Sequence, residues 1–348
     1  MSNGNGIAAR KAIETLIGGK HLNREEARKM MSDIMDGLVT QAQIGSLLTA
    51  LRMKGETEEE LTGFAEAMRQ KAAQIGLAQQ NLLDTAGTGG DGANTFNIST
   101  ASAIVAAAGG VRVAKHGNRA VSSKSGSADV LEALGVNISL TAEQAIDCLN
   151  SIGICFMFAQ LYHPSMKYAA SPRKELGVRT VFNLLGPLTN PAGADHQLLG
   201  VFDRNKTPVM ASVLRSLGLK RALVVSSLDG LDEISISQAT QISELKDGKI
   251  RTYEINPDHL GLGQYPLQKV KGGNALENAE IINRIFEGEP GACRDIVLAN
   301  SAACFYVTGK AGSLQEGVKL AKDLIDSGKA RQKLQELVRY TRDLSYVS

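Results

Sequence analysis

Four glycines within six residues form the segment of this sequence best suited to bind an anion. They are Gly87, Gly89, Gly90 and Gly92, with Asp91 between the last two. Because glycine has no Cβ, it adopts positive φ angles and lets several backbone N–H groups face one ligand. A helix is expected to begin shortly afterwards, and a helix N-terminus adds free N–H donors. The polar side chains at that point are Thr95, Asn97, Ser99 and Thr100. We interpret this segment as an anion site rather than as an ordinary turn before a capped helix.

Two familiar phosphate-binding motifs fit this loop poorly. A Walker loop is excluded because no Lys-Ser or Lys-Thr pair follows the glycines at the required spacing. The dinucleotide fingerprint is disfavoured because Asp91 stands between the last two glycines and no convincing ribose-binding acid follows downstream. The anion must therefore be identified from other segments.

A second donor-rich segment, residues 115–127, follows the run 111–114, which predicts a short strand. The segment contains two lysines, one arginine and four serines. In open α/β sheets, ligands bind beyond the carboxyl ends of the strands. This position favours an anion-binding role over a merely solvated basic loop.

The composition indicates a globular chain with no general affinity for polyanions. The 348 residues are 43% hydrophobic and 21% charged, and the 38 basic and 36 acidic residues leave a net charge of +2. We therefore expect no nucleic-acid or membrane partner. The polar first ten residues resemble no signal peptide, and the four cysteines include no CxxC pair. We expect a cytoplasmic protein.

The first 80 residues predict a small, all-helical unit. Apolar residues recur at helical spacing up to the pair Gly18-Gly19. Asn23, Thr40 and Thr57 are candidate N-caps, and Asn23 is followed by Glu26 in a capping-box pattern. The helices expected after these caps span residues 24–37, 41–54 and 58–74.

From residue 81 the pattern changes to short apolar runs that alternate with helices. This alternation predicts an α/β domain with a mostly parallel central sheet flanked by helices, over residues 81–348. Residues 234–255 alternate around a Lys-Asp-Gly-Lys turn and predict an antiparallel hairpin. The strands expected before that hairpin are 82–83, 111–114, 154–159, 198–202 and 222–226, and the helices expected after it are 274–288, 292–308, 313–326 and 329–342.

Several long motifs in a fixed order resemble the anthranilate phosphoribosyltransferases, over nearly the whole chain. They are the glycine loop 87–92, Thr-Phe-Asn-Ile-Ser-Thr at 95–100, Lys-His-Gly-Asn-Arg at 115–119, and the segments 163–167, 176–180, 183–191 and 229–234. The resemblance implies transfer of a phosphoribosyl group from 5-phosphoribosyl 1-pyrophosphate to the amine of anthranilate, the second dedicated step of tryptophan synthesis.

The resemblance also implies which residues bind the donor. Lys115 is the best candidate for electrostatic help in catalysis, and no residue is expected to act as a dedicated general base. The implied donor-binding residues are Gly87, Gly90, Asp91, Thr95, Asn97, Ile98, Ser99, Thr100, Lys115, His116, Gly117, Asn118, Arg119, Ala120, Val121, Ser122, Ser123 and Ser127.

By the same resemblance, Asp232, Glu233 and the Ser99 hydroxyl hold Mg²⁺, whose preference for oxygen ligands agrees with this set. Without the resemblance, such an acidic pair is more often a solvated turn. No cluster of His and Cys points to zinc.

The resemblance assigns the acceptor to Gly87, Asn118 and Arg173, because an arginine fork suits the carboxylate of anthranilate. The proline that the family usually has two residues before this arginine is shifted by one, to Pro172. A changed local helix geometry is therefore expected. His116 and His163 can line the acceptor path or serve as structural hydrogen-bonding groups.

Two other functions stay open at this point, a pyrimidine nucleoside phosphorylase and a relative that binds nucleic acid without catalysis. The basic segment 115–119 and the Asp232-Glu233 pair argue against the first, and the weak net charge argues against the second. We expect residues 163–185 to join the helical unit as an insertion, with the substrates in the cleft between the two units. The resemblance also implies a homodimer formed through the helical unit.

Overall fold

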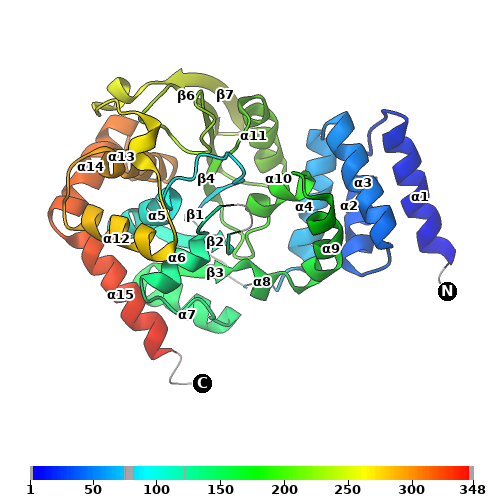
Figure 1. The fold of residues 1–348 in the computed structure, drawn as a ribbon, viewed down its shortest axis with the longest axis horizontal. Helices are drawn as coiled ribbons and strands as arrows, with labels where there is room; N and C mark the ends of the chain where they lie inside the picture. The colour runs from blue at the N-terminus through cyan, green and yellow to red at the C-terminus, as the bar shows by residue number, and fades with distance from the viewer. Residues whose placement is uncertain (1–2, 74, 76–80, 121–122, 345–348) are drawn as a thin grey trace.

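The computed structural model describes residues 3–73, 75, 81–120 and 123–344. A bundle of helices lies at one end of the long axis, and a larger α/β part lies at the other (Figure 1). Among the described residues, no helix is long and apolar enough to cross a bilayer.

The N-terminal bundle forms where the sequence predicts it. Asn23, Thr40 and Thr57 each accept a hydrogen bond from the backbone N–H three residues on, and each closes a capping box. These side chains satisfy N–H groups that a helix leaves unpaired at its start. The expected ends 37 and 74 are too late by two and three residues. The bundle helices are α1 Asn3–Ile17, α2 Arg24–Met35, α3 Gln41–Lys54 and α4 Glu58–Lys71.

A seven-stranded sheet forms the centre of the α/β part, in the order β3-β2-β1-β4-β5-β6-β7. The pairs from β3 to β5 are parallel, whereas β5–β6 and β6–β7 are antiparallel. The expected hairpin is confirmed, but its first strand begins at Thr240 rather than at residue 234. The strands are β1 Leu82–Gly87, β2 Arg112–Gly117, β3 Ile154–Phe158, β4 His196–Gly200, β5 Arg221–Ser227, β6 Thr240–Lys246 and β7 Lys249–Ile255.

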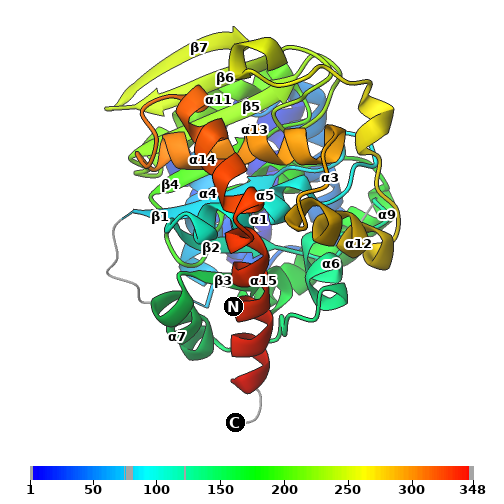
Figure 2. The ribbon, with the colours of Figure 1, turned by 90° about the vertical axis from the view of Figure 1, so that its left-hand side faces the viewer.

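Helices cover both faces of this sheet (Figure 2). On β5, Leu223 and Val225 join one hydrophobic core, while Ala222 and Val224 join another that continues into the N-terminal bundle. This alternation follows from the two-residue period of a strand. The remaining helices are α5 Ile98–Ala108, α6 Ser127–Ala133, α7 Ala142–Ile152, α8 Ala159–Tyr162, α9 Lys167–Leu176, α10 Val181–Leu185, α11 Thr207–Ser216, α12 Ala275–Phe286, α13 Ala292–Val307, α14 Leu314–Asp326 and α15 Lys329–Asp343, with short 3-10 turns at Pro164–Met166, Gly186–Leu188, Arg204–Lys206, Pro257–Leu260 and Leu267–Val270.

The segment expected as an insertion into the helical unit does pack there. Helix α9 contacts α2 and α3, and α10 contacts α3 and α4. Figure 1 shows α9 beside the bundle helices and α10 between the bundle and the sheet. Pro172 lies inside α9, which continues through it to Leu176. The shifted proline therefore does not end the helix that carries Arg173.

One expectation about the sheet is wrong. The sequence places Lys115, His116 and Gly117 in a loop after a strand that ends at residue 114, but β2 continues to Gly117. The strand is extended because these residues pair with β3, from Lys115 opposite Phe156 to Gly117 opposite Phe158. Lys115 therefore projects from a strand, which restricts its backbone far more than a loop would.

Candidate functional site

A cavity of about 690 Å³ lies where the ends of β1 and β2 meet the N-terminus of α5 and the segment from α8 to α10. Thr100 does not line the cavity but is buried in α5. Val121 and Ser122 lie outside the described residues. The expected site residues that line the cavity are Gly87, Gly90, Asp91, Thr95, Asn97, Ile98, Ser99, Lys115, His116, Gly117, Asn118, Arg119, Ala120, Ser123, Ser127, Arg173, Asp232 and Glu233.

The glycine loop has the backbone conformation that the sequence predicts. Gly89, Gly90 and Gly92 have φ angles of +63°, +77° and +73°, a region that side chains other than glycine rarely adopt. At Gly87 the requirement is space instead, because a Cβ there would collide with the Asp232 carboxylate. The glycines therefore serve two purposes. Gly87 leaves room for the buried Asp232 carboxylate, and the other three allow the backbone conformation that an anion-binding loop requires.

Asp232 and Glu233 are adjacent acidic residues whose charged forms are disfavoured by burial and by neighbouring negative charge. The Asp232 carboxylate accepts a hydrogen bond of 2.7 Å from the Gly89 N–H. Burial, and then the charge of Asp91, raise the pKa of Asp232 to about 7. Burial and the neighbouring Asp232 raise the pKa of Glu233 well above its usual value, although Lys115 opposes this shift. Among the described residues, neither carboxylate forms an ion pair, and the charge of Lys115 only partly offsets the shift at Glu233.

The chemistry of this donor set fits Mg²⁺. Among the described residues, no three His, Cys, Asp or Glu side chains are grouped as a metal site. Mg²⁺ is often held by only one or two carboxylates, with substrate phosphates and waters as its other ligands. A dication beside Asp232 and Glu233 would relieve the repulsion that raises their pKa values, and the Ser99 hydroxyl lines the same cavity.

Lys115 is buried at the cavity floor and held by two contacts. Its ammonium donates to the Thr85 carbonyl at 2.5 Å and to the Ser99 hydroxyl at 3.2 Å. Burial lowers the pKa of Lys115, while the charges of Asp84 and Glu233 act in the opposite direction. The position beside Ser99 agrees with a role in offsetting negative charge on a bound anion.

Asp84 supports Lys115 and was missed by the sequence reasoning. The register pairs β1 with β2 only at Leu82 and Leu83, so the two strands separate at Asp84. There the Asp84 carboxylate accepts the His116 backbone N–H at 3.1 Å, which replaces a backbone partner. Only the meeting of the two strands reveals this contact, since 32 residues separate its partners.

Two histidines line the cavity as a pair. The rings of His116 and His163 lie 5.1 Å apart in an edge-to-face arrangement. Burial, followed by the charges of His163 and Lys115, lowers the pKa of His116 to about 3. Burial also lowers the pKa of His163 to about 4. Both rings are therefore neutral at physiological pH, and neither adds positive charge to the cavity.

Arg173 is one of two cations that α9 contributes to the cavity lining, and Lys167 is the other. Its guanidinium lies 4.9 Å from the centre of the Phe182 ring, and burial lowers its pKa. Among the described residues, no carboxylate lies within ion-pair distance of Arg173. A guanidinium in this state is suited to bind a carboxylate ligand.

Arg179 joins the two sides of the cavity, and the sequence reasoning assigned it no role. It lies between α9 and α10 and donates to the Gly90 carbonyl at 2.9 Å. Its guanidinium also stacks 4.3 Å from the centre of the Phe202 ring. The motif 176–180 contains this arginine, but the contact with a residue 89 positions away appears only in the folded chain.

The chain matches two family models that together cover most of its length. A model described as "Glycosyl transferase family, helical bundle domain" matches residues 10–72. A model described as "Glycosyl transferase family, a/b domain" matches residues 79–331. These two models correspond to the helical bundle and the α/β part of the fold.

Individual relatives narrow this assignment. An anthranilate phosphoribosyltransferase of Brevibacillus brevis is 56% identical over 326 residues, which cover 94% of this chain and 96% of the relative. The crystal structure of the Thermus thermophilus enzyme of that name matches with a TM-score of 0.90 and 44% identity, over 95% of this chain and 99% of the other. The Saccharomyces cerevisiae enzyme matches over 97% and 98% of the two chains, with a TM-score of 0.88, in a complex with PRPP and Mg (26% identity) and in one with 4-fluoroanthranilate (25% identity). On these matches and this fold, the chain belongs to the anthranilate phosphoribosyltransferase family.

Proposed function

We propose that the chain transfers the phosphoribosyl group of 5-phosphoribosyl 1-pyrophosphate to the amine of anthranilate, giving N-(5-phosphoribosyl)anthranilate and pyrophosphate, in tryptophan biosynthesis. The observation that carries the proposal is that one cavity is lined by the glycine loop, by Asp232 and Glu233, and by Arg173, which has no ion-pair partner among the described residues. The relatives reported above all have this activity in their names, and they support neither of the two alternative functions.

The donor binds at the sheet edge in this proposal. The N–H groups of the glycine loop and of the α5 N-terminus face the pyrophosphate, and the buried Lys115 ammonium offsets part of its charge. Asp232, Glu233 and Ser99 would hold Mg²⁺, which supplies charge neutralisation for the leaving pyrophosphate.

The acceptor binds on the side of α9. Arg173 forms the ion pair with the anthranilate carboxylate, and Asn118 and Gly87 lie across the cavity toward the donor. Because the two neighbouring histidines are neutral, the carboxylate pairs with the Arg173 guanidinium rather than with an imidazolium in this proposal. This arrangement directs the amine toward the anomeric carbon of the donor.

The reaction then requires alignment more than proton transfer. The amine attacks the anomeric carbon with inversion as pyrophosphate leaves, and its lone pair is already free at neutral pH. No general base is assigned for this reason. Lys115 and the loop N–H groups stabilise the charge that grows on the leaving group.

The division of the chain near residue 80, with residues 163–185 counted with the helical unit, is also a proposal, which the contacts of α9 and α10 support.

A homodimer through the helical unit is proposed as well, because Ile17 and Met53 expose 72% and 83% of their surface on α1 and α3. Light scattering on a size-exclusion column tests the dimer. The cytoplasmic location stays a prediction.

The activity is tested by mixing the protein with anthranilate, 5-phosphoribosyl 1-pyrophosphate and Mg²⁺ and following anthranilate fluorescence. We expect the fluorescence to disappear, and to persist when the donor or Mg²⁺ is omitted. Folded protein that leaves anthranilate unchanged would refute the proposal. Cleavage of thymidine by phosphate would instead favour the nucleoside phosphorylase.

A further inference from the structure

The described ends of the segment between β2 and α6 meet beside the cavity. Its two ends, residues 118–120 and 123–127, both contribute to the cavity lining. Gly126 packs directly against the opposite end, where a Cβ would lie 2.5 Å from the Ala120 nitrogen and from the Asn118 oxygen. The two ends are therefore in backbone contact.

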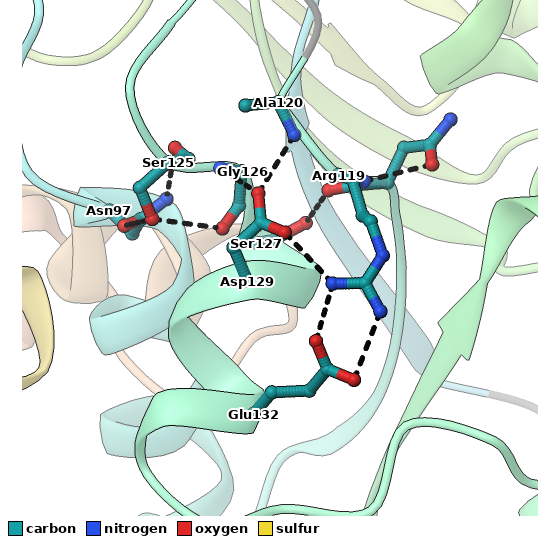
Figure 3. A network of polar contacts seen from close by, with 9 residues as sticks. Asn97, Arg119, Ala120, Ser125, Gly126, Ser127, Asp129 and Glu132 are labelled. Carbon is teal, nitrogen blue, oxygen red and sulfur yellow. Dashed lines mark hydrogen bonds and ion pairs between the residues drawn. The ribbon is translucent and has the colours of Figure 1, made fainter. Parts of the chain in front are cut away.

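One carboxylate of α6 joins these ends. Asp129 Oδ2 accepts the backbone N–H of Ala120 at 2.9 Å and that of Gly126 at 2.8 Å (Figure 3). Burial alone would raise the pKa of Asp129, but these two N–H groups and the Arg119 guanidinium lower it below its usual value. The charged form of Asp129 is thus the one that holds the loop closed.

Arg119 takes part in the same network. Its guanidinium donates to Asp129 Oδ1 at 3.0 Å and forms a two-pronged ion pair with Glu132. It also lies 5.4 Å from the centre of the Phe158 ring. Figure 3 shows the guanidinium directed at the two acids of α6. Two carboxylates and a ring thus already engage the side chain that the resemblance assigned to the donor.

The closed loop is connected to the part of the site that faces the donor. The Asn97 amide, at the start of α5, donates to the Ser125 carbonyl at 3.1 Å. The Ala128 N–H donates to the Asn118 carbonyl at 3.2 Å. A change in loop shape therefore reaches both Asn118 and the helix that carries Ser99.

We infer that Asp129 is a positioning residue that holds the donor-binding loop in shape, and that Arg119 acts within this network with Glu132 instead of binding a phosphate of the donor. The inference rests on the proposed function, because it assumes that the cavity binds a phosphorylated donor. It adds a role for α6, whose acidic side chains the proposed reaction does not use.

Direct phosphate binding and positioning by Arg119 predict opposite results for Glu132→Gln. If Arg119 binds a phosphate, loss of the competing carboxylate frees the guanidinium and tightens donor binding. If Arg119 positions the loop, the same change loosens the network and weakens donor binding. Glu132 is 42% exposed, so this substitution leaves the core intact.

The experiment measures the Kd of 5-phosphoribosyl 1-pyrophosphate with Mg²⁺ by calorimetry, and the KM of both substrates, for Asp129→Asn, Glu132→Gln, Arg119→Gln and the double variant at 119 and 132. Asp129→Asn keeps the side-chain shape but loses an acceptor, and we expect it to weaken donor binding about 10–100-fold. Glu132→Gln and Arg119→Gln should each weaken donor binding less than Asp129→Asn does. The double variant should bind the donor no more weakly than Arg119→Gln alone.

Glu143→Gln, in the first turn of α7 and exposed, is the matched control and should behave as the wild type. Tighter donor binding by Glu132→Gln, or additive losses in the double variant, would overturn the inference. If Asp129→Asn fails to fold, the donor affinities of the variants at positions 119 and 132 are sufficient to test the inference. A wild-type protein that binds the donor but does not consume anthranilate would count against the proposed function and leave this binding comparison valid.

Discussion

The two sides of the cavity are built in different ways. On the side proposed to bind the donor, Lys115 and Asp232 are buried, Glu233 is half-buried, and backbone groups hold Lys115 and Asp232 in place. On the acceptor side, Arg173 projects from a helix of the bundle and contacts a ring rather than a carboxylate. The carboxylates of Asp232 and Glu233 would therefore be stabilised by a bound cation. The Arg173 guanidinium, on the other side, would be stabilised by a bound anion.

This difference suggests a division of labour between the two structural units. The parallel sheet supplies rigid positions for charges that must be aligned with the reacting bond. In the proposed function, α9 beside the bundle recognises the smaller substrate, and Arg179 connects the two sides through its hydrogen bond to the Gly90 carbonyl. Substitutions on the donor side should therefore affect turnover, whereas those on the acceptor side should affect the binding of one substrate.

The largest effect is expected for Asp232→Asn. The change removes one of the carboxylates proposed to hold the Mg²⁺ that would offset the charge of the departing pyrophosphate, and we expect kcat/KM to fall about 10²–10³-fold, in line with the loss of one electrostatic contact in a transition state. Steady-state kinetics at several Mg²⁺ concentrations measure it, with the exposed Asp258→Asn as control. An unchanged Mg²⁺ dependence would remove Asp232 from the metal site.

Lys115→Met should have the next largest effect, a decrease in kcat of about 10²-fold, because the buried ammonium stabilises charge that develops during the reaction. Arginine should rescue little, since the cavity floor holds the ammonium 2.5 Å from the Thr85 carbonyl. Turnover rates at saturating substrates provide the measurement. If the methionine variant turns over at the wild-type rate, the electrostatic role of Lys115 is wrong.

Arg173→Gln tests the acceptor side. Loss of a hydrogen-bonded ion pair of about 1.5–3 kcal/mol should raise the anthranilate KM about 10–100-fold and leave the donor KM nearly unchanged. Lys174→Gln, on the exposed side of the same helix, is the matched control. Equal increases in both KM values would show that the two sides are not separate.

The smallest effect concerns pH. Because the pKa of Asp232 is raised to about 7, its carboxyl is partly protonated below that pH and must lose the proton to bind Mg²⁺. Binding of donor and Mg²⁺ should therefore strengthen as the pH rises from 6 to 8, by up to about tenfold per pH unit below 7. Calorimetry in buffers of different ionisation enthalpy measures the released protons. The Asp232→Asn variant should lack this component.

The sequence predicted the local features of the site well and the long-range ones poorly. The positive φ angles of the glycine loop and the three N-caps follow from residue types over a few positions. The extension of β2 through Lys115 depends on pairing with a strand about forty residues later, so local patterns did not show it.

The site residues that came from the resemblance also gathered in one cavity, with Thr100 as the described exception. Their mutual contacts could not be predicted. The partners of Arg119 illustrate this, because its sequence neighbours suggest a phosphate ligand whereas the fold places Asp129 and Glu132 around its guanidinium. A positive residue in a donor-rich loop does not reveal which anion it binds.

The most direct test of the two-sided cavity is a crystal structure of the chain with 5-phosphoribosyl 1-pyrophosphate, Mg²⁺ and an anthranilate analogue that cannot react. We expect the pyrophosphate to bind against residues 87–92 and the metal to bind to Asp232 and Glu233. The carboxylate of the analogue should bind to Arg173. A pyrophosphate bound to Arg173, or an analogue carboxylate bound at the glycine loop, would contradict it.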